Sequence, residues 1–229
     1  MTASVLQFNS HSQNAGVSSW TVTLPSATAG SALLLDVFIN DGRTISAVTD
    51  SSSNTWAAIQ SVTDGVLQIR QWRAYNIAAS AGTLTVTITF DSATATVGAA
   101  LREVGGVALS AAVDQYAGQS QTNPGTGTNA VTSGATATLG TQPAIVLGTA
   151  ARRDGTTAAA AGTGFTSDGT ANAYYDNYAF RCESKRVTAT TGVAATFTAN
   201  GAGDDFITMV VVMDERTVAP RGARYYYGA

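Results

Sequence analysis

Apolar and polar residues alternate with a period of two along several stretches of this chain. In residues 83–90 an apolar residue stands at every even position and a threonine at every odd one, the pattern of a strand with one buried and one solvated face. A second apolar stripe covers residues 33–39, before the turn-forming triplet Asn40-Asp41-Gly42. No segment combines helical periodicity with caps and sufficient length. Further strands are expected at residues 20–24, 55–62, 66–75, 97–104, 144–151, 174–182, 194–198 and 206–213.

This pattern predicts an all-β chain built as an antiparallel, jelly-roll-like β-sandwich. At 229 residues it is long enough for one large sandwich or two small domains, and a domain of this size buries roughly 70% of its unfolded surface without a metal or disulfide. Charged residues make up 12%, against about 25% in ordinary soluble domains. Such a composition suits strands and loops better than long solvated helices.

A weak internal repeat divides the expected strands into two similar halves. Corresponding features are separated by 110 to 113 residues. The matched pairs are Leu33 with Ile145, Asp41 with Asp154, Gly82 with Gly192, and Glu103 with Glu215. Duplication and chance similarity in a low-complexity sequence both remain open.

A polar, turn-rich segment at residues 118–128 lies between the two halves, residues 1–117 and 129–215. It is either a linker between two small domains or a crossover inside one sandwich. We favour the crossover, with a single domain over residues 1–215, because each half alone offers few strands to cover its apolar faces.

Two features bear on assembly. Residues 206–213 are apolar on both faces, although a sandwich strand needs only one apolar face, so a loop or another subunit is expected to cover the second. Residues 216–229 have no strand pattern, and they are either a frayed tail or an extended arm that docks on a neighbouring subunit. Arginine and tyrosine are frequent interface anchors. The candidate assembly contacts are therefore Arg216, Arg221, Arg224, Tyr225, Tyr226 and Tyr227.

Residues suited to catalysis are few. The one histidine, His11, lies in a polar stretch, and a Ser-His-Asp mechanism or a histidine-ligated metal would depend on it. The single cysteine, Cys182, excludes an internal disulfide and is expected to fill a small apolar space. We therefore expect that the protein is not an enzyme and that it binds no cofactor and no metal ion.

Acidic clusters have simple structural interpretations. Asp204 and Asp205 are the most site-like pair for glycoside hydrolysis, but they also suit a tight loop before a strand. The segment Asp50-Ser-Ser-Ser-Asn54 spaces oxygen atoms as a calcium loop does, yet it lacks that loop's glycine and distal glutamate. A β-turn with Asx and serine capping explains it without an ion.

Aromatic residues offer a second kind of binding surface. The tryptophans at 20, 56 and 72 fall inside expected strands, where packing is the default. Tyr174, Tyr175 and Tyr178 follow a glycine-rich loop, and they are the candidate platform for a host surface glycan.

The formal net charge of −3 gives no basic footprint for nucleic acid. The first residues show no basic and apolar signal peptide, and no apolar run approaches the ~18 residues of a membrane helix. We expect neither a nucleic-acid nor a membrane partner. An extracellular-like composition without an export signal fits a virion protein made in the host cytoplasm, or a chain from which a signal was removed.

Several motifs of the first half occur in a familiar order. They are Ala29-Gly30-Ser-Ala-Leu33, Asp50-Ser-Ser-Ser-Asn54-Thr-Trp56, Trp72-Arg-Ala-Tyr75, the threonine strand 83–89, and Glu103-Val-Gly-Gly-Val107. This order resembles a jelly-roll-like family of bacteriophage virion proteins and related bacterial surface proteins. Ser53 stands where the family's turn has glycine, and Val104-Gly105 where it has Tyr-Ser. The resemblance implies a structural or adhesive role and carries over no catalytic residue.

The sequence thus favours a homo-oligomeric structural protein of a phage head or tail surface that binds other virion proteins. A carbohydrate-binding or adhesin module is the alternative. A glycan-cleaving enzyme that uses Asp204 or Asp205 comes third.

Overall fold

The computed structural model describes residues 2–40, 42–122, 128–153, 159–169, 179–200 and 205–217. This part of the chain contains strands and no helix, which confirms the all-β prediction; accordingly, it offers no helical segment that would span a bilayer. The strands are β1 (Ser4–Leu24), β2 (Ala32–Ile39), β3 (Ile45–Asp50), β4 (Trp56–Thr63), β5 (Gln68–Ala74), β6 (Leu84–Gly105), β7 (Val113–Thr122), β8 (Thr128–Thr132), β9 (Ala144–Arg152), β10 (Ala160–Ala161), β11 (Thr166–Gly169), β12 (Ala179–Val187), β13 (Thr196–Asn200) and β14 (Asp205–Asp214).

The strands form two halves with the same antiparallel strand order. The large sheet of the first half runs β1-β6-β2-β5-β4, with β3 also paired to β6. The large sheet of the second half runs β7-β14-β9-β12-β11, and a small sheet runs β10-β13-β8. Strand β1 of the first half therefore corresponds to β7 followed by β8, and β6 corresponds to β13 followed by β14. Each half is a sandwich of two layers. In the first half the long antiparallel pair β1 and β6 contributes to both layers. In the second half the shorter pairs β7 with β14 and β8 with β13 take the same places.

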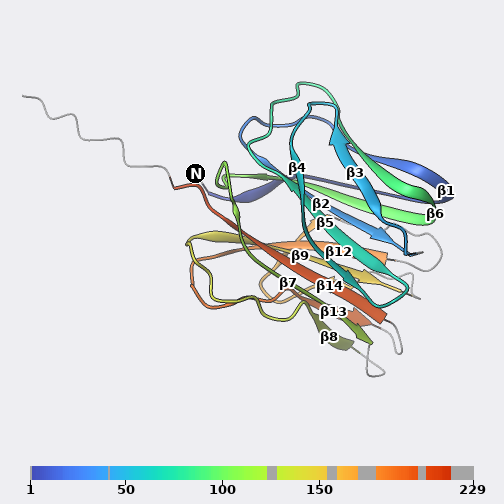
Figure 1. Ribbon diagram of the computed structural model, residues 1–229. Helices are drawn as coiled ribbons and strands as arrows, with labels where there is room; N and C mark the ends of the chain where they lie inside the picture. The colour runs from blue at the N-terminus through green and yellow to red at the C-terminus, as the bar shows by residue number, and fades with distance from the viewer. Residues whose placement is uncertain are drawn as a thin grey trace, which may run out of the picture.

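The two sandwiches stack through their large sheets (Figure 1). Each half has its own internal core, and two further clusters join residues of both halves. Strand β1 lies against β11 and β12, while β7 lies against β4. Because β1 corresponds to β7 and β4 to β11, the two halves are related by an approximate two-fold axis, as the subunits of an isologous dimer are.

Strand β14 explains the apolar character of residues 206–213. Phe206, Val210 and Val212 pack inside the second half, whereas Ile207, Met209 and the next alternate residues pack against the first half. The second apolar face is thus covered neither by a loop nor by another subunit, as the sequence had suggested, but by the other half of the same chain.

The repeat is present, but its spacing differs from the one read in the sequence. Leu33 faces the internal core of the first half, whereas Ile145 faces the other half, so an offset of 112 places equivalent residues on opposite faces. Leu33 pairs with Glu103 in the sheet, and Ala144 pairs with Asp214. Both steps equal 111 residues (144 − 33 and 214 − 103), so the counterpart of Glu103 is Asp214 and not Glu215.

The halves also divide earlier than the polar segment suggested. Residues 118–122, expected in a crossover, belong to β7 and pair with β14 of the second half. A Cβ atom on Gly118 would lie 2.6 Å from Cγ2 of Val62. This glycine therefore allows β7 to approach β4 closely, and the boundary between the halves falls between Gly105 and Val113.

Candidate functional site

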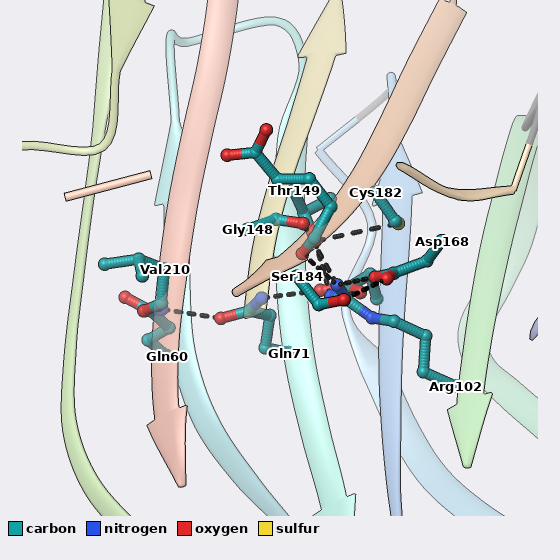
Figure 2. Close-up of polar contacts among 11 residues, drawn as sticks. Gln60, Gln71, Arg102, Gly148, Thr149, Asp168, Cys182, Ser184 and Val210 are labelled. Atoms are coloured by element: carbon teal, nitrogen blue, oxygen red, sulfur yellow. Dashed lines mark hydrogen bonds and ion pairs between the residues drawn. The ribbon is translucent and has the colours of Figure 1, made fainter. Parts of the chain in front are cut away.

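A buried cluster of polar side chains joins the two halves, and Arg102 is at its centre (Figure 2). Its Nη2 atom donates to Oδ2 of Asp36 at 2.7 Å and to Oγ1 of Thr149 at 2.7 Å. Its Nη1 atom donates to the carbonyl of Gly148 at 3.0 Å and to Oδ2 of Asp168 at 3.2 Å. Asp36 comes from the first half, and the other three acceptors come from the second. One guanidinium therefore binds both halves.

A line of amides extends this cluster toward β14. Gln71 donates to Oδ1 of Asp36 at 2.6 Å, and Gln60 donates to Oε1 of Gln71 at 2.5 Å and to the carbonyl of Val210 at 3.0 Å. On the opposite side, Ser184 donates to Asp168 (Figure 2). Most polar atoms of the cluster are thus paired, as buried polar groups usually are. The arrangement holds the halves in one register.

The cysteine and a glutamate of β12 lie beside this cluster on opposite faces of the strand. Cys182 is fully buried, with its Sγ atom 3.8 Å from Oγ1 of Thr149, and burial raises the pKa of its thiol to about 12. Because the thiolate is the reactive form, Cys182 is unsuited to nucleophilic catalysis at neutral pH. It fills space in the core between the halves.

Glu183 points into the second half and is fully buried. Its Oε2 atom accepts a hydrogen bond from the backbone N–H of Gly162 at 2.8 Å. Burial raises the pKa of this carboxyl to about 7, although hydrogen bonds from the backbones of Gly162 and Thr196 partly offset the effect. Glu183 belongs to the core of the second sandwich and does not line any of the hollows described below.

The residues considered for catalysis lie apart. His11 is exposed on β1, with its Nδ1 atom 3.3 Å from the carbonyl of Thr21 and its ring centroid 4.4 Å from that of Trp20. Asp205 forms an ion pair with Arg153, while Asp204 lies outside the described residues. Within the described ranges, no group of three or more histidine, cysteine, aspartate or glutamate side chains is placed to hold a metal ion.

The segment from Asp50 to Asn54 forms the expected turn. Oδ1 of Asp50 accepts from the backbone N–H groups of Ser52 at 2.8 Å and Asn54 at 3.2 Å, and Oδ2 accepts from Nε1 of Trp56 at 2.7 Å. Ser53 has a φ of 56°, in the left-handed region that glycine adopts freely. Ser53, at the position where the similar family has glycine, therefore adopts a left-handed backbone conformation that glycine favours.

Of the candidate assembly contacts, the structure describes Arg216. Its Nη2 atom donates to the carbonyl of Gly30 at 2.8 Å, and its backbone N–H donates to the carbonyl of Gly106 at 2.7 Å. The side chain helps to line a hollow of about 210 Å³ together with Ser4 and Leu6. The other candidates, Arg221, Arg224, Tyr225, Tyr226 and Tyr227, lie outside the described residues.

The candidate glycan platform, Tyr174, Tyr175 and Tyr178, likewise lies outside the described residues. The tryptophans behave as the strand pattern predicts: Trp20 is buried, and Trp56 and Trp72 pack against the core of the first half.

A set of hollows along β1 is the surface feature that the sequence did not indicate. A cleft of about 410 Å³ lies between the start of β1 and strands β11 and β12. A hollow of about 350 Å³ lies between Asn9–His11 and the Thr21–Thr23 part of the same strand, and the hollow at Arg216 shares Ser4 and Leu6 with the cleft. One sequence signal could have pointed here: residues 4–24 contain no lysine, arginine, aspartate or glutamate.

Comparisons with known proteins add little to this geometry. No family model matches the chain, and no curated protein matches it. Among solved structures, the major capsid protein P2 from bacteriophage PM2 is 10% identical, over 95% of this chain and 100% of that chain, with a TM-score of 0.26. AerE from Microcystis aeruginosa is 9% identical, over 90% of this chain and 87% of that chain, also with a TM-score of 0.26. Similarities this low carry no argument about function.

Proposed function

We propose that this chain is a non-enzymatic structural component of a bacteriophage particle that binds other subunits on the head or tail surface. The observation that carries the proposal is the placement of its polar side chains. Arg102, Asp36 and Asp168 are buried and engaged with one another between the halves, while the open hollows follow an uncharged strand edge. In the described residues these buried charges are thus used inside the molecule, and the hollows offer surface for contact with other subunits.

The two-sandwich body suits this role physically. Strands β2, β9 and most of β14 are buried, and two apolar clusters join the halves beside the Arg102 cluster. A large apolar interface of this kind limits relative motion of domains. The motif order of the first half supports the phage assignment, since it resembles virion β-sandwich proteins. The left-handed backbone at Ser53 agrees with that resemblance at its most distinctive turn.

The end of the chain supplies the proposed contact with neighbouring subunits. Arg216 is fixed to the first half through Gly30 and Gly106, so the residues after it start from a defined point on the body. Those residues include Arg221, Arg224 and Tyr225–Tyr227, types that often dominate interface energetics. In this proposal they bind a neighbouring subunit, in a homo-oligomer or in a complex with another virion protein.

The test is mass spectrometry of density-purified particles from the source culture, combined with light scattering of the purified chain and of a variant that lacks residues 218–229. Presence in particles, with an oligomer that depends on the deleted residues, supports the proposal. Absence from every particle fraction overturns it. Binding of oligosaccharides by such an absent chain would instead favour the carbohydrate-binding alternative.

A further inference from the structure

Strand β1 is an edge strand with an unusual composition. It pairs with β6 on one side and ends the strand order of its sheet, so in the described part of the chain no strand pairs with its outer side. Natural proteins commonly protect long edges with charges, prolines or bulges. The 21 residues of β1 contain no charged residue and no proline, and pairing with β6 is regular from Gln7 to Asn14, between two irregularities.

The C-terminal part of this edge is occupied from within the molecule. The side chains of Gln7, Asn9 and His11 reach across the sandwich to the backbone carbonyls of three residues in or just after the second part of β1. The carbonyls are those of Ser26 at 3.3 Å, Thr23 at 2.8 Å and Thr21 at 3.3 Å. Two of these contacts, from Asn9 and His11, lie at the hollow of about 350 Å³ between the two parts of β1. They leave the segment from Ser4 to Asn14 as the part of the edge that can accept another strand.

The approximate two-fold axis shows what is missing at this edge. At the equivalent edge, β4 has eight residues and lies tightly against β7, with Val62 packed over Gly118. At the β1 edge the equivalent strand is β11, which covers four residues up to the end of that described range at Gly169, and the 410 Å³ cleft lies between β1 and β11. Phe8 and Ile145 contribute apolar surface to the cleft, and Leu6 at its rim is 47% exposed.

We propose that this edge accepts residues 218–229 of a second copy as an added antiparallel strand; this inference rests on the proposed function of that segment. Strand addition takes its affinity from main-chain hydrogen bonds and its specificity from alternate side chains. Three consecutive tyrosines favour extended structure and provide aromatic surface for the hollows beside Leu6 and Phe8. Strand β1 itself carries no charge, and the cleft beside it is lined by Asp168 as well as by Lys185 and Arg186.

Geometry assigns the segment to a second copy and not to the same one. Arg216 lies in the hollow that contains Ser4 and Leu6, beside the start of β1. A segment that ran from there along its own β1 would be parallel to it, whereas every strand pair in the described structure is antiparallel. To pair antiparallel in its own copy it would first have to cross about 33 Å to Asn14, most of the roughly 40 Å that it can span. Exchange around a two-fold axis removes this cost.

The experiment uses the full-length chain. Light scattering compares the wild type with Leu6→Lys and with Val66→Lys, a control at a residue that is also 47% exposed but lies in the turn before β5. Hydrogen exchange of residues 4–14 is measured at high and low protein concentration, and a synthetic peptide of residues 218–229 is added as competitor. We expect Leu6→Lys to weaken association by about tenfold or more, Val66→Lys to leave it unchanged, exchange of residues 4–14 to slow on association, and the peptide to dissociate the oligomer.

Thermal melting of both variants checks that each is folded, and hydrogen exchange on the wild type tests the edge without any substitution. If deletion of residues 218–229 prevents association while Leu6→Lys behaves as Val66→Lys and exchange in residues 4–14 stays constant, the segment docks elsewhere. That outcome overturns this inference and leaves the proposed function intact. If Leu6→Lys dissociates the oligomer but the deletion does not, the edge pairs with something other than the C-terminal segment, and the inference is again wrong.

Discussion

Nη2 of Arg102 lies 2.7 Å from Oδ2 of Asp36, and the two side chains are only 0% and 3% exposed. Removing one partner of a buried ion pair leaves an uncompensated charge and typically costs about 3–5 kcal/mol. We therefore expect Arg102→Met to lower the free energy of unfolding by that amount, because Asp36 and Asp168 both lose their cation. Denaturant unfolding measures it.

Two further variants control for this prediction. Arg43→Met removes an exposed guanidinium that donates to Ser92, and surface changes of this kind stay within about 0.5 kcal/mol. The double variant Arg102→Met/Asp36→Leu removes both charges of the pair, and it should recover part of the loss. Equal stability of Arg102→Met and Arg43→Met would show that the cluster does not hold the halves together.

A second prediction concerns Gly98 on β6, which lies under the ring of Phe38. A Cβ atom at this position would lie 1.9 Å from Cε1 of Phe38, and Phe38 is itself packed edge-on against Phe180 with ring centroids 5.4 Å apart. Overpacking of a close-packed core costs about 1–3 kcal/mol, so Gly98→Ala should destabilise the protein by at least that much. Gly82→Ala, where a Cβ atom meets nothing within 4 Å, should have little effect in the same urea titration.

A third prediction concerns the pH dependence contributed by Glu183. Its pKa in the folded state is about 7, above the ordinary value of 4.5, so the folded protein holds this proton where the unfolded chain has lost it. The contribution to stability is therefore complete below about pH 4.5 and is lost as the pH rises to about 7. Since one pKa unit is worth about 1.4 kcal/mol, a shift of this size corresponds to a loss on the order of 3 kcal/mol.

Glu183→Gln should remove that dependence, so the variant gains stability relative to the wild type as the pH rises from 4.5 to 7. Glu215 provides a control of opposite sign, because a hydrogen bond from Arg186 lowers its pKa. Glu215→Gln should therefore lose stability relative to the wild type above the ordinary glutamate pKa. Urea midpoints of the three proteins, measured from well below pH 4.5 up to pH 7, check both signs, because Glu215 titrates in the lower part of this range and Glu183 in the upper part. A parallel response of the two variants would contradict the prediction.

A fourth prediction concerns the turn residue Ser53. A left-handed backbone costs an L-residue roughly 1–2 kcal/mol, while glycine adds entropy to the unfolded chain. Ser53→Gly should therefore stabilise the protein by about 0.5–1 kcal/mol. Ser52→Gly is the matched control. Ser52 does not have a positive φ, so glycine relieves no strain there and should destabilise the protein by about 0.5–1 kcal/mol. Thermal denaturation of both variants measures the two effects, and equal melting temperatures for the two variants would contradict the prediction.

The sequence predicted the buried strands well and the edge strands poorly. Residues 33–39, 84–90 and 206–213 are apolar at alternate or all positions, and they lie in β2, β6 and β14. Strands β3, β7, β8, β10 and β11 and most of β1 were missed, whereas the edge strand β4 was predicted at residues 55–62. The missed strands lie at the sheet edges, where side chains are half-exposed on both faces and no period of two develops.

The register of the repeat was beyond the sequence for a related reason. The triplets Leu33–Leu35 and Ile145–Leu147 are apolar at every position, so a shift by one residue leaves the match unchanged although it turns every side chain to the other face. The strand pairing within the sheets was needed to establish the offset of 111 residues between the two halves.

The Arg102 cluster had one visible sign in the sequence. Asp36 interrupts the apolar run of residues 33–39, and a charged residue inside a buried strand requires a partner. The partners of Asp36 are Arg102 on β6 and Gln71 on β5. Arg102 in turn binds Asp168 on β11 in the other half, and no local pattern connects these positions.

The double burial of β14 has a consequence for how the protein is made. The core of the second sandwich and most of the surface that joins it to the first both need Phe206–Met213, which is the last strand of the described chain. During synthesis, a ribosome must therefore release more than two hundred residues before either can form. The apolar face of the first sandwich stays exposed to solvent until then. β-proteins with many non-local strand contacts tend to aggregate or depend on chaperones under such conditions.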